Sequence, residues 1–139
     1  MENTAAGKTA HYDVIVIGGG PAGLSCALVL GRCKRKVLVC DSGFPRNRFS
    51  QAMHSFLSLD GEHPKVFLDR ARQELKKYGV HYKRTEVVTA QSNSGGFLVT
   101  TKNGSEYVAK KLVLATGISD TLPAIGNISR FYGKTVLHL

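Results

Sequence analysis

The 139-residue sequence contains few cysteines and no apolar run that approaches the length of a membrane helix. Such a helix needs about 20 consecutive apolar residues, and residues 1–10 are too polar to form a secretory signal peptide. The three cysteines, Cys26, Cys33 and Cys40, form neither a C-x-x-C pair nor a zinc-binding spacing, and their odd number argues against a disulfide scaffold. We therefore expect a soluble, cytoplasmic protein with a flexible leader over residues 1–10, and we predict no metal site and no catalytic residue.

Acidic residues are also scarce, because 10 Asp and Glu stand against 19 Lys and Arg, which gives a formal net charge of +9. Such an excess can indicate a partner that is anionic, either a nucleic acid or a ligand that carries phosphate groups. The densest basic cluster, over residues 32–36, lies between a predicted helix and a predicted strand, and the last turn of a helix favours cations in any protein. A nucleic-acid-binding function is therefore the least favoured interpretation.

The first half of the sequence alternates between β-branched apolar runs and amphipathic segments. The apolar runs at 12–17 and 37–40 are typical of strands that are buried on both faces. Helices are predicted from Pro21 to about Gly31 and from Pro64 to Tyr78, each with proline in its first turn, and a short strand is predicted at 80–82. The loop at 41–61 has no clean period, and a loop of that length is usually functional or ordered by a ligand.

From Thr85 onward the pattern changes to the alternation of an antiparallel sheet. Three strands are predicted at 86–91, 97–101 and 106–109, with turns at Ser94-Gly95-Gly96 and Asn103-Gly104. The run at 112–115 is predicted to be a further buried, parallel strand. The order predicts an α/β protein with a Rossmann-type parallel sheet and an antiparallel β-meander insertion.

The glycine-rich segment at 18–23 fits the pattern G-x-G-x-x-G, and its context makes the match informative. A buried strand precedes it, a helix follows it, and Asp41 ends the next strand. In such a motif Gly18 permits a tight turn, Gly20 lets the backbone approach a pyrophosphate, and Gly23 allows the helix to pack on the sheet. The pyrophosphate would lie at the positive N-terminal end of the helix, and Asp41 would accept hydrogen bonds from a ribose and repel a 2′-phosphate.

These residues also carry a resemblance to a known family. Residues 13–23 resemble the FAD-binding start of thioredoxin reductases, and Leu112-Val113-Leu114-Ala115-Thr116-Gly117 is similar to the Ala-Thr-Gly stretch later in their FAD domain. Arg46-Asn47, followed by His54 and Asp60-Gly61, resembles the branch of thioredoxin reductase-like proteins that includes fungal dithiol oxidases. The sequence departs from the family pattern at Ser55 and Leu59.

The resemblance implies an FAD site in which the glycine loop cradles the pyrophosphate and Asp41 holds the ribose. Arg46 and Asn47 would lie in the loop that crosses the cofactor, His54 near the flavin, and Val87 beside the adenine, while residues 115–117 would pass close to the cofactor. The implied cofactor-binding residues are Gly18, Gly19, Gly20, Pro21, Ala22, Gly23, Asp41, Arg46, Asn47, His54, Val87, Ala115, Thr116 and Gly117.

In the family, an NADPH-binding domain with a redox C-x-x-C pair follows a stretch like residues 131–136, and a later segment completes the FAD site. We therefore expect residues 11–139 to form the N-terminal portion of an FAD-binding domain, with a second chain or further domain completing the flavin site and NADPH required only in a complete relative.

The function implied is the FAD-binding part of a thioredoxin reductase-like oxidoreductase that transfers electrons between NAD(P)H, flavin and a disulfide or dithiol. A non-catalytic dinucleotide-binding module and the N-terminal portion of a flavin monooxygenase are the alternatives, so whether the chain turns over a substrate stays open. The resemblance also implies a homodimer.

Overall fold

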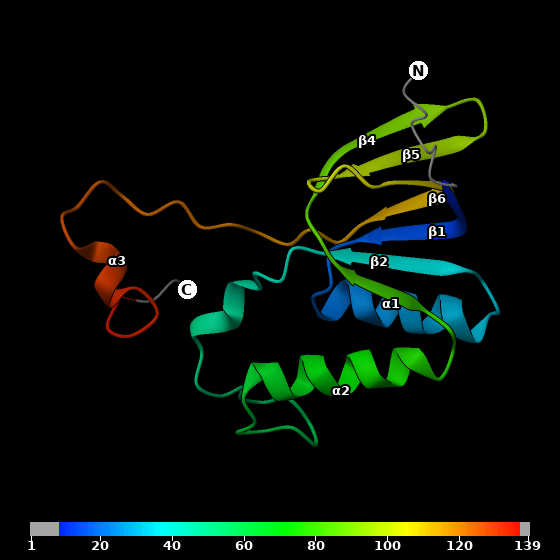
Figure 1. Ribbon diagram of the computed structural model, residues 1–139. Coiled ribbons are helices and arrows are strands. Elements are labelled where there is room, and N and C mark those ends of the chain that lie inside the picture. The colour runs from blue at the N-terminus through cyan, green and yellow to red at the C-terminus, as the bar shows by residue number, and fades with distance from the viewer. Residues whose placement is uncertain (1–8, 137–139) are drawn as a thin grey trace.

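The computed structural model describes residues 9–136, and its centre is a six-stranded sheet in the order β3-β2-β1-β6-β5-β4 (Figure 1). The parallel part comprises β1 (Ala10–Ile17), β2 (Val37–Asp41), β3 (His81–Arg84) and β6 (Glu106–Leu114). The antiparallel part adds β4 (Val87–Asn93) and β5 (Gly96–Thr101) through pairing with β6. The predicted Rossmann-type sheet with a β-meander is confirmed. Most of the predicted leader lies outside the described residues, and Ala10 is already the first residue of β1.

Two helices cover one face of the parallel strands, α1 (Pro21–Arg32) and α2 (Pro64–Lys76) (Figure 1). Each begins with the proline that the sequence places in its first turn. Backbone N–H groups in that turn make no intrahelical hydrogen bond, so proline, which lacks an N–H, is tolerated there. A 3₁₀ helix, η1 (Arg46–Phe49), interrupts the long loop after β2, and a short helix, α3 (Ile128–Phe131), follows the extended segment after β6. Among the described residues, no helix combines the length and the apolar character needed to span a bilayer.

The core has two halves because the central strands are apolar on both faces. Val16 and Val39 pack with Leu75 on the side of the helices. Ile15 and Leu38 pack on the opposite side with residues of β5 and β6. All five of these side chains are at most 1% exposed. Neighbouring side chains on a strand point to opposite faces, so a continuous apolar run is what a strand buried on both sides requires.

The three cysteines are free: Cys26 is partly buried on α1, Cys33 is exposed, and Cys40 is buried in β2. The predicted helix from Pro64 extends less far than expected, because α2 ends at Lys76 and Tyr78 lies beyond it with 41% of its surface exposed.

Strand β6 corrects the prediction of two separate strands at 106–109 and 112–115. It runs without a break from Glu106 to Leu114, pairing with β5 in antiparallel fashion and with β1 in parallel fashion. Lys110 and Lys111 lie within the strand, and the Lys110 Nζ bonds Asp13 Oδ1 on β1 at 2.7 Å. The predicted burial of residues 112–115 is also wrong at Leu114, which is 70% exposed.

Candidate functional site

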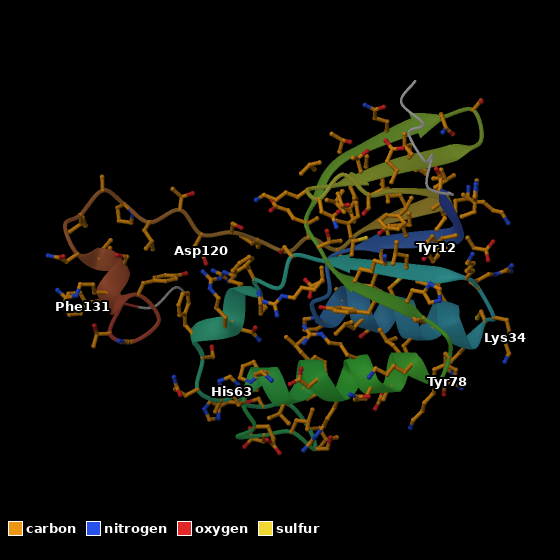
Figure 2. All side chains as sticks on the ribbon, viewed as in Figure 1. Tyr12, Lys34, His63, Tyr78, Asp120 and Phe131 are labelled. Atoms are coloured by element: carbon orange, nitrogen blue, oxygen red, sulfur yellow. The ribbon has the colours of Figure 1, made fainter. Side chains whose placement is uncertain are left out.

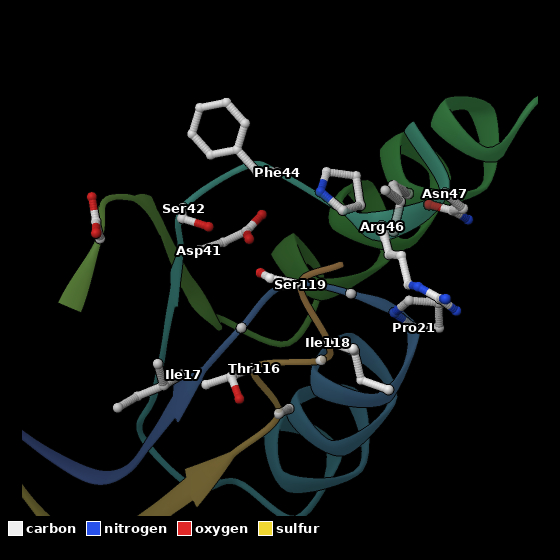
Figure 3. A pocket seen from close by; sticks show the side chains of 18 of the residues that line it. Ile17, Pro21, Asp41, Ser42, Phe44, Arg46, Asn47, Thr116, Ile118 and Ser119 are labelled. Atoms are coloured by element: carbon white, nitrogen blue, oxygen red, sulfur yellow. The ribbon is translucent and has the colours of Figure 1, made fainter. Parts of the chain in front are cut away.

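A cleft of about 710 Å³ opens where β1, β2 and β6 end (Figure 3). These three strands are parallel, so their carboxyl ends meet at one edge of the sheet. Strand β2 pairs with one side of β1, whereas β6 pairs with the other side. Such a switch in strand order leaves a crevice in which doubly wound sheets bind their ligands.

The structure brings eleven of the fourteen predicted site residues to the lining of this cleft. Those eleven are Gly18, Gly19, Gly20, Pro21, Asp41, Arg46, Asn47, Val87, Ala115, Thr116 and Gly117. Ala22 and Gly23 lie in the first turn of α1, and His54 lies in the loop before α2; none of these three lines the cleft. The contact of each residue with a cofactor stays a prediction.

Three glycines are required by the chain itself, two in the loop between β1 and α1 and one in the first turn of α1. Gly18 has a φ of 108°, and a Cβ atom there would lie 2.1 Å from the carbonyl oxygen of Ala115. At Gly23 a Cβ would lie 2.0 Å from the carbonyl oxygen of Gly18, and at Gly19 it would lie 2.6 Å from Asp41 Oδ2. A side chain at any of these positions would therefore overlap a neighbouring segment.

Gly20 differs from these three, because the structure itself gives no reason for a glycine there. Its φ of −78° and ψ of −176° suit any residue, and apart from Gly20 itself and its two chain neighbours no heavy atom lies within 4 Å of the place a Cβ would take. That open space belongs to the cleft, which Gly20 lines. A glycine in this environment lets a ligand approach the backbone, as the motif predicts.

The N-terminal end of α1 is suited to an anion. Gly20 is its N-cap, and within the described part of the chain no side chain caps the helix and no acidic residue lies in its first turn. The first N–H groups of a helix have no intrahelical partners, and together with the helix dipole they attract phosphate groups. The residues present therefore fit the pyrophosphate of a dinucleotide.

Asp41 ends β2 beside the glycine loop, and only 8% of its surface is exposed. Its Oδ1 accepts a hydrogen bond from the Gly43 N–H at 3.1 Å, and its Oδ2 accepts one from the Tyr82 hydroxyl. The Nη2 of Arg72 lies 3.5 Å from Oδ2. Burial, and after it the hydrogen bond to Asp41, raises the pKa of Tyr82 to about 12, so this hydroxyl remains a donor at neutral pH.

Arg46 is held by a partner that the sequence does not reveal. Its Nε and Nη2 donate to the two carboxylate oxygens of Asp120 at 2.8 and 2.9 Å, and the Tyr132 hydroxyl donates to the same carboxylate at 2.7 Å. These bonds tie η1 to the extended segment that follows β6 (Figure 2). The hydrogen bond to Asp120 is the main reason why the pKa of Arg46 lies above its ordinary value.

The cleft also contains residues that the sequence analysis does not predict, namely Ile17, Ser42, Phe44, Pro45, Leu68, Arg72, Glu86, Ile118 and Ser119. Most of them adjoin predicted residues along the chain, so extending the predicted segments by two or three positions finds them. Arg72 has a different signal, because it lies one helical turn after the buried Leu68 on an otherwise apolar face of α2. A charged group on such a face indicates a buried partner, which here is Asp41.

The groups that line the cleft are of the kinds that bind a ligand. No cysteine is among the described residues that line it. Within residues 9–136, His, Cys, Asp and Glu side chains do not gather in groups of three that could hold a metal ion. Its wall combines backbone groups, one buried carboxylate and apolar side chains such as Ile17 and Leu68, which is the usual character of a cofactor site.

Comparison with known proteins agrees with this geometry. Residues 12–138 match the model of the pyridine nucleotide-disulphide oxidoreductase family. The chain is 40% identical to a protein of Arthroderma benhamiae named as a probable thioredoxin reductase, over 98% of this chain and 35% of that protein. It is 38% identical to a thioredoxin reductase of Gibberella zeae, over 88% of this chain and 39% of that one.

Among solved structures, the crystal structure of an oxidoreductase from Agrobacterium tumefaciens superimposes with a TM-score of 0.83 and 38% identity. The match covers 89% of this chain and 42% of that one. The chain thus spans between 35% and 42% of the length of these three relatives. The family match, which covers most of the chain, shows that the protein belongs to the pyridine nucleotide-disulphide oxidoreductase family and carries its thioredoxin reductase-like, Rossmann-type fold.

Proposed function

We propose that the cleft binds the adenosine diphosphate half of FAD, and that the chain is the FAD-binding part of a thioredoxin reductase-like oxidoreductase. The observation that supports this most directly is Gly20, where the backbone is unstrained and a Cβ would meet no heavy atom within 4 Å. The fold alone does not require a glycine there, whereas a pyrophosphate that lies against the backbone does.

Each part of the cleft would then bind one part of the cofactor. The N–H groups at the start of α1 would bind the pyrophosphate, and Asp41 would accept a hydrogen bond from the adenosine ribose. Val87 would lie beside the adenine, and Asn47 together with residues 115–117 would lie along the rest of the cofactor. His54 would come near the flavin only in the assembled site.

The charge of Asp41 supports FAD over NADP at this site. A buried carboxylate would repel the 2′-phosphate of NADP, because like charges repel each other strongly in a medium of low dielectric constant. In the complete oxidoreductase the bound flavin would supply the redox chemistry and pass electrons between NAD(P)H and a disulfide or dithiol. The residues of this chain would bind and orient the cofactor.

The test is a titration of the 139-residue chain with FAD, followed by the quenching of flavin fluorescence. Gly20→Val fills the space against which the pyrophosphate would lie, and we expect it to weaken FAD binding at least about tenfold, a loss of about 1.4 kcal/mol. Gly126→Val is the matched control, because Gly126 also has an ordinary φ and no heavy atom within 4 Å of its Cβ position, and it does not line the cleft. Equal FAD affinity in Gly20→Val and the unmodified chain would overturn the proposal.

A non-catalytic dinucleotide-binding module is the second candidate, and the cysteines favour it. Cys26, Cys33 and Cys40 are free, and none of them lines the cleft, so the described residues offer no thiol beside the proposed cofactor. Adding NADPH to the FAD-loaded chain without oxygen tests this second candidate. Loss of the flavin absorbance would rule out a non-catalytic module, because the chain would then accept hydride.

A further inference from the structure

Asp41 receives hydrogen-bond donors from three separate segments of the chain. The N–H of Gly43 comes from the loop after β2, the hydroxyl of Tyr82 from β3, and the guanidinium of Arg72 from α2. Tyr82 and Arg72 also contact each other, because the guanidinium carbon of Arg72 lies 5.1 Å from the centre of the Tyr82 ring. A side chain with this many partners has little freedom to change its rotamer.

The same contacts hold the carboxylate against the glycine loop. A Cβ at Gly19 would lie 2.6 Å from both Cγ and Oδ2 of Asp41, so the carboxylate occupies the space that the missing side chain leaves. An ionised carboxylate has about four acceptor positions, and the donors above fill about three of them. About one position therefore remains for a ligand in the cleft.

Arg72 has its own fixed arrangement. Its Nη1 donates to Asp69 Oδ1 at 3.1 Å, while its Nη2 faces Asp41, so the guanidinium lies between two carboxylates. Its Nε is buried and, among the described residues, has no hydrogen-bond partner. The cation thus offsets the charge of Asp41 at the point where an anionic ligand would approach.

We propose that Tyr82 is a positioning residue for the adenosine ribose, because it fixes the carboxylate of Asp41, and that Arg72 tunes the charge of that carboxylate toward an anionic ligand. Tyr82 orients the carboxylate toward a ribose hydroxyl. Arg72 offsets part of the charge of Asp41 and so weakens its repulsion of the pyrophosphate, while the carboxylate beside the ribose still disfavours a 2′-phosphate. This inference rests on the proposed function, because it assumes that an adenosine diphosphate group occupies the cleft.

The test for Tyr82 compares ADP with 2′-deoxy-ADP, both titrated by calorimetry into the full chain and into Tyr82→Phe. We expect the unmodified chain to bind ADP about tenfold more tightly than 2′-deoxy-ADP, as one hydrogen bond to a charged group implies. Tyr82→Phe should lose most of this preference and keep its affinity for 2′-deoxy-ADP. Tyr12→Phe is the matched control, because its hydroxyl is also hydrogen-bonded, but to His81 Nδ1 at 2.9 Å and not to Asp41.

A second variant, Arg72→Gln, tests the effect of charge. It should weaken ADP and 2′-deoxy-ADP by similar factors, and the loss should shrink as salt is added, because salt screens the repulsion. Circular dichroism verifies that each variant is folded.

The outcomes separate this inference from the proposed function. An undiminished preference for ADP in Tyr82→Phe, an equal loss for both nucleotides in that variant, or no preference in the unmodified chain would overturn the role of Tyr82. Arg72→Gln with unchanged affinity at low salt would overturn that of Arg72. If the unmodified chain binds neither ADP nor FAD, the proposed function itself fails.

Discussion

Alanine substitution at Gly20 and at Gly23, two glycines near the start of α1, should have different effects on the stability of the protein. Gly20→Ala adds a methyl group that points into open space, whereas Gly23→Ala places one 2.0 Å from the carbonyl oxygen of Gly18 and 3.3 Å from Ala115 Cβ. If the fold requires Gly23 but not Gly20, then Gly23→Ala should destabilise the protein in the absence of any ligand, and Gly20→Ala should not.

The magnitudes follow from the local geometry. Overpacking usually costs about 1–3 kcal/mol, and at Gly23 the overlapping atom belongs to the backbone and cannot rotate away, so we expect a loss of about 3 kcal/mol or more. At Gly20, alanine restricts the unfolded chain and gains about 0.4–1 kcal/mol. Alanine is also a poorer N-cap than glycine, which costs about the same amount, so the two effects should nearly cancel.

The assay is urea unfolding of each variant without nucleotide, monitored by far-UV circular dichroism. The slope of the unfolding free energy against urea concentration is compared with that of the unmodified chain. The same variants are then titrated with FAD, and only Gly20→Ala should combine an unchanged free energy of unfolding with weaker binding. If Gly20→Ala loses as much stability as Gly23→Ala, then the fold itself needs Gly20, and the reasoning that connects this glycine to a ligand is refuted.

Three further predictions concern a core leucine, the reactivity of two cysteines and the pH dependence that Tyr82 causes. Leu75→Ala removes a side chain that is 1% exposed, and it should lower the free energy of unfolding in urea by about 2–5 kcal/mol. Cys33 is exposed, whereas Cys40 is buried and its pKa is raised to about 11, so iodoacetamide should modify Cys33 first, as peptide mass spectrometry would show; equal rates would contradict the burial of Cys40. The pKa of Tyr82 rises from 10.0 to about 12 on folding, so its contribution to stability is complete below pH 10 and is lost as the pH approaches 12. Urea unfolding across this pH range should show a smaller loss in Tyr82→Phe than in the unmodified chain.

The parts of the fold that the sequence predicts are those set by local patterns. A continuous apolar run such as residues 14–17 fits a strand buried on both faces, and Pro21 and Pro64 mark the starts of the two helices. The parallel order then determines the position of the cleft, because the glycine loop and Asp41 both follow strands that end at one edge of the sheet.

The continuity of β6 could not be predicted in this way, because it depends on a distant strand. Lys110 and Lys111 interrupt the apolar pattern, and a polar pair within such a pattern is typical of a break between strands. In the structure Lys111 pairs with Val14 on β1, and Lys110 bonds to Asp13, which lies 97 positions away in the sequence. The pairing with β1 and this contact hold the strand together across the two lysines.

The partner of Arg46 could not be predicted from the sequence either. The family resemblance places Arg46 in the loop that crosses the cofactor, and in the structure it donates two hydrogen bonds to Asp120, 74 positions along the chain. The side chain is 36% exposed, so the pair can open at little cost when a stronger acceptor is present. A phosphate that enters the cleft would compete with Asp120 for the same planar donor group.

The three glycines that define the motif G-x-G-x-x-G differ in how strongly they indicate a ligand. Of the three glycines that define G-x-G-x-x-G, the structure explains Gly18 and Gly23 by contacts within the chain, with Ala115 and with each other. Both would therefore be expected in a protein with this turn whether or not it binds a nucleotide. Only Gly20 has no such explanation, because its backbone is ordinary and its surroundings are open. The motif therefore indicates a ligand chiefly through this one position, and substitutions there test binding more directly than substitutions at the other two.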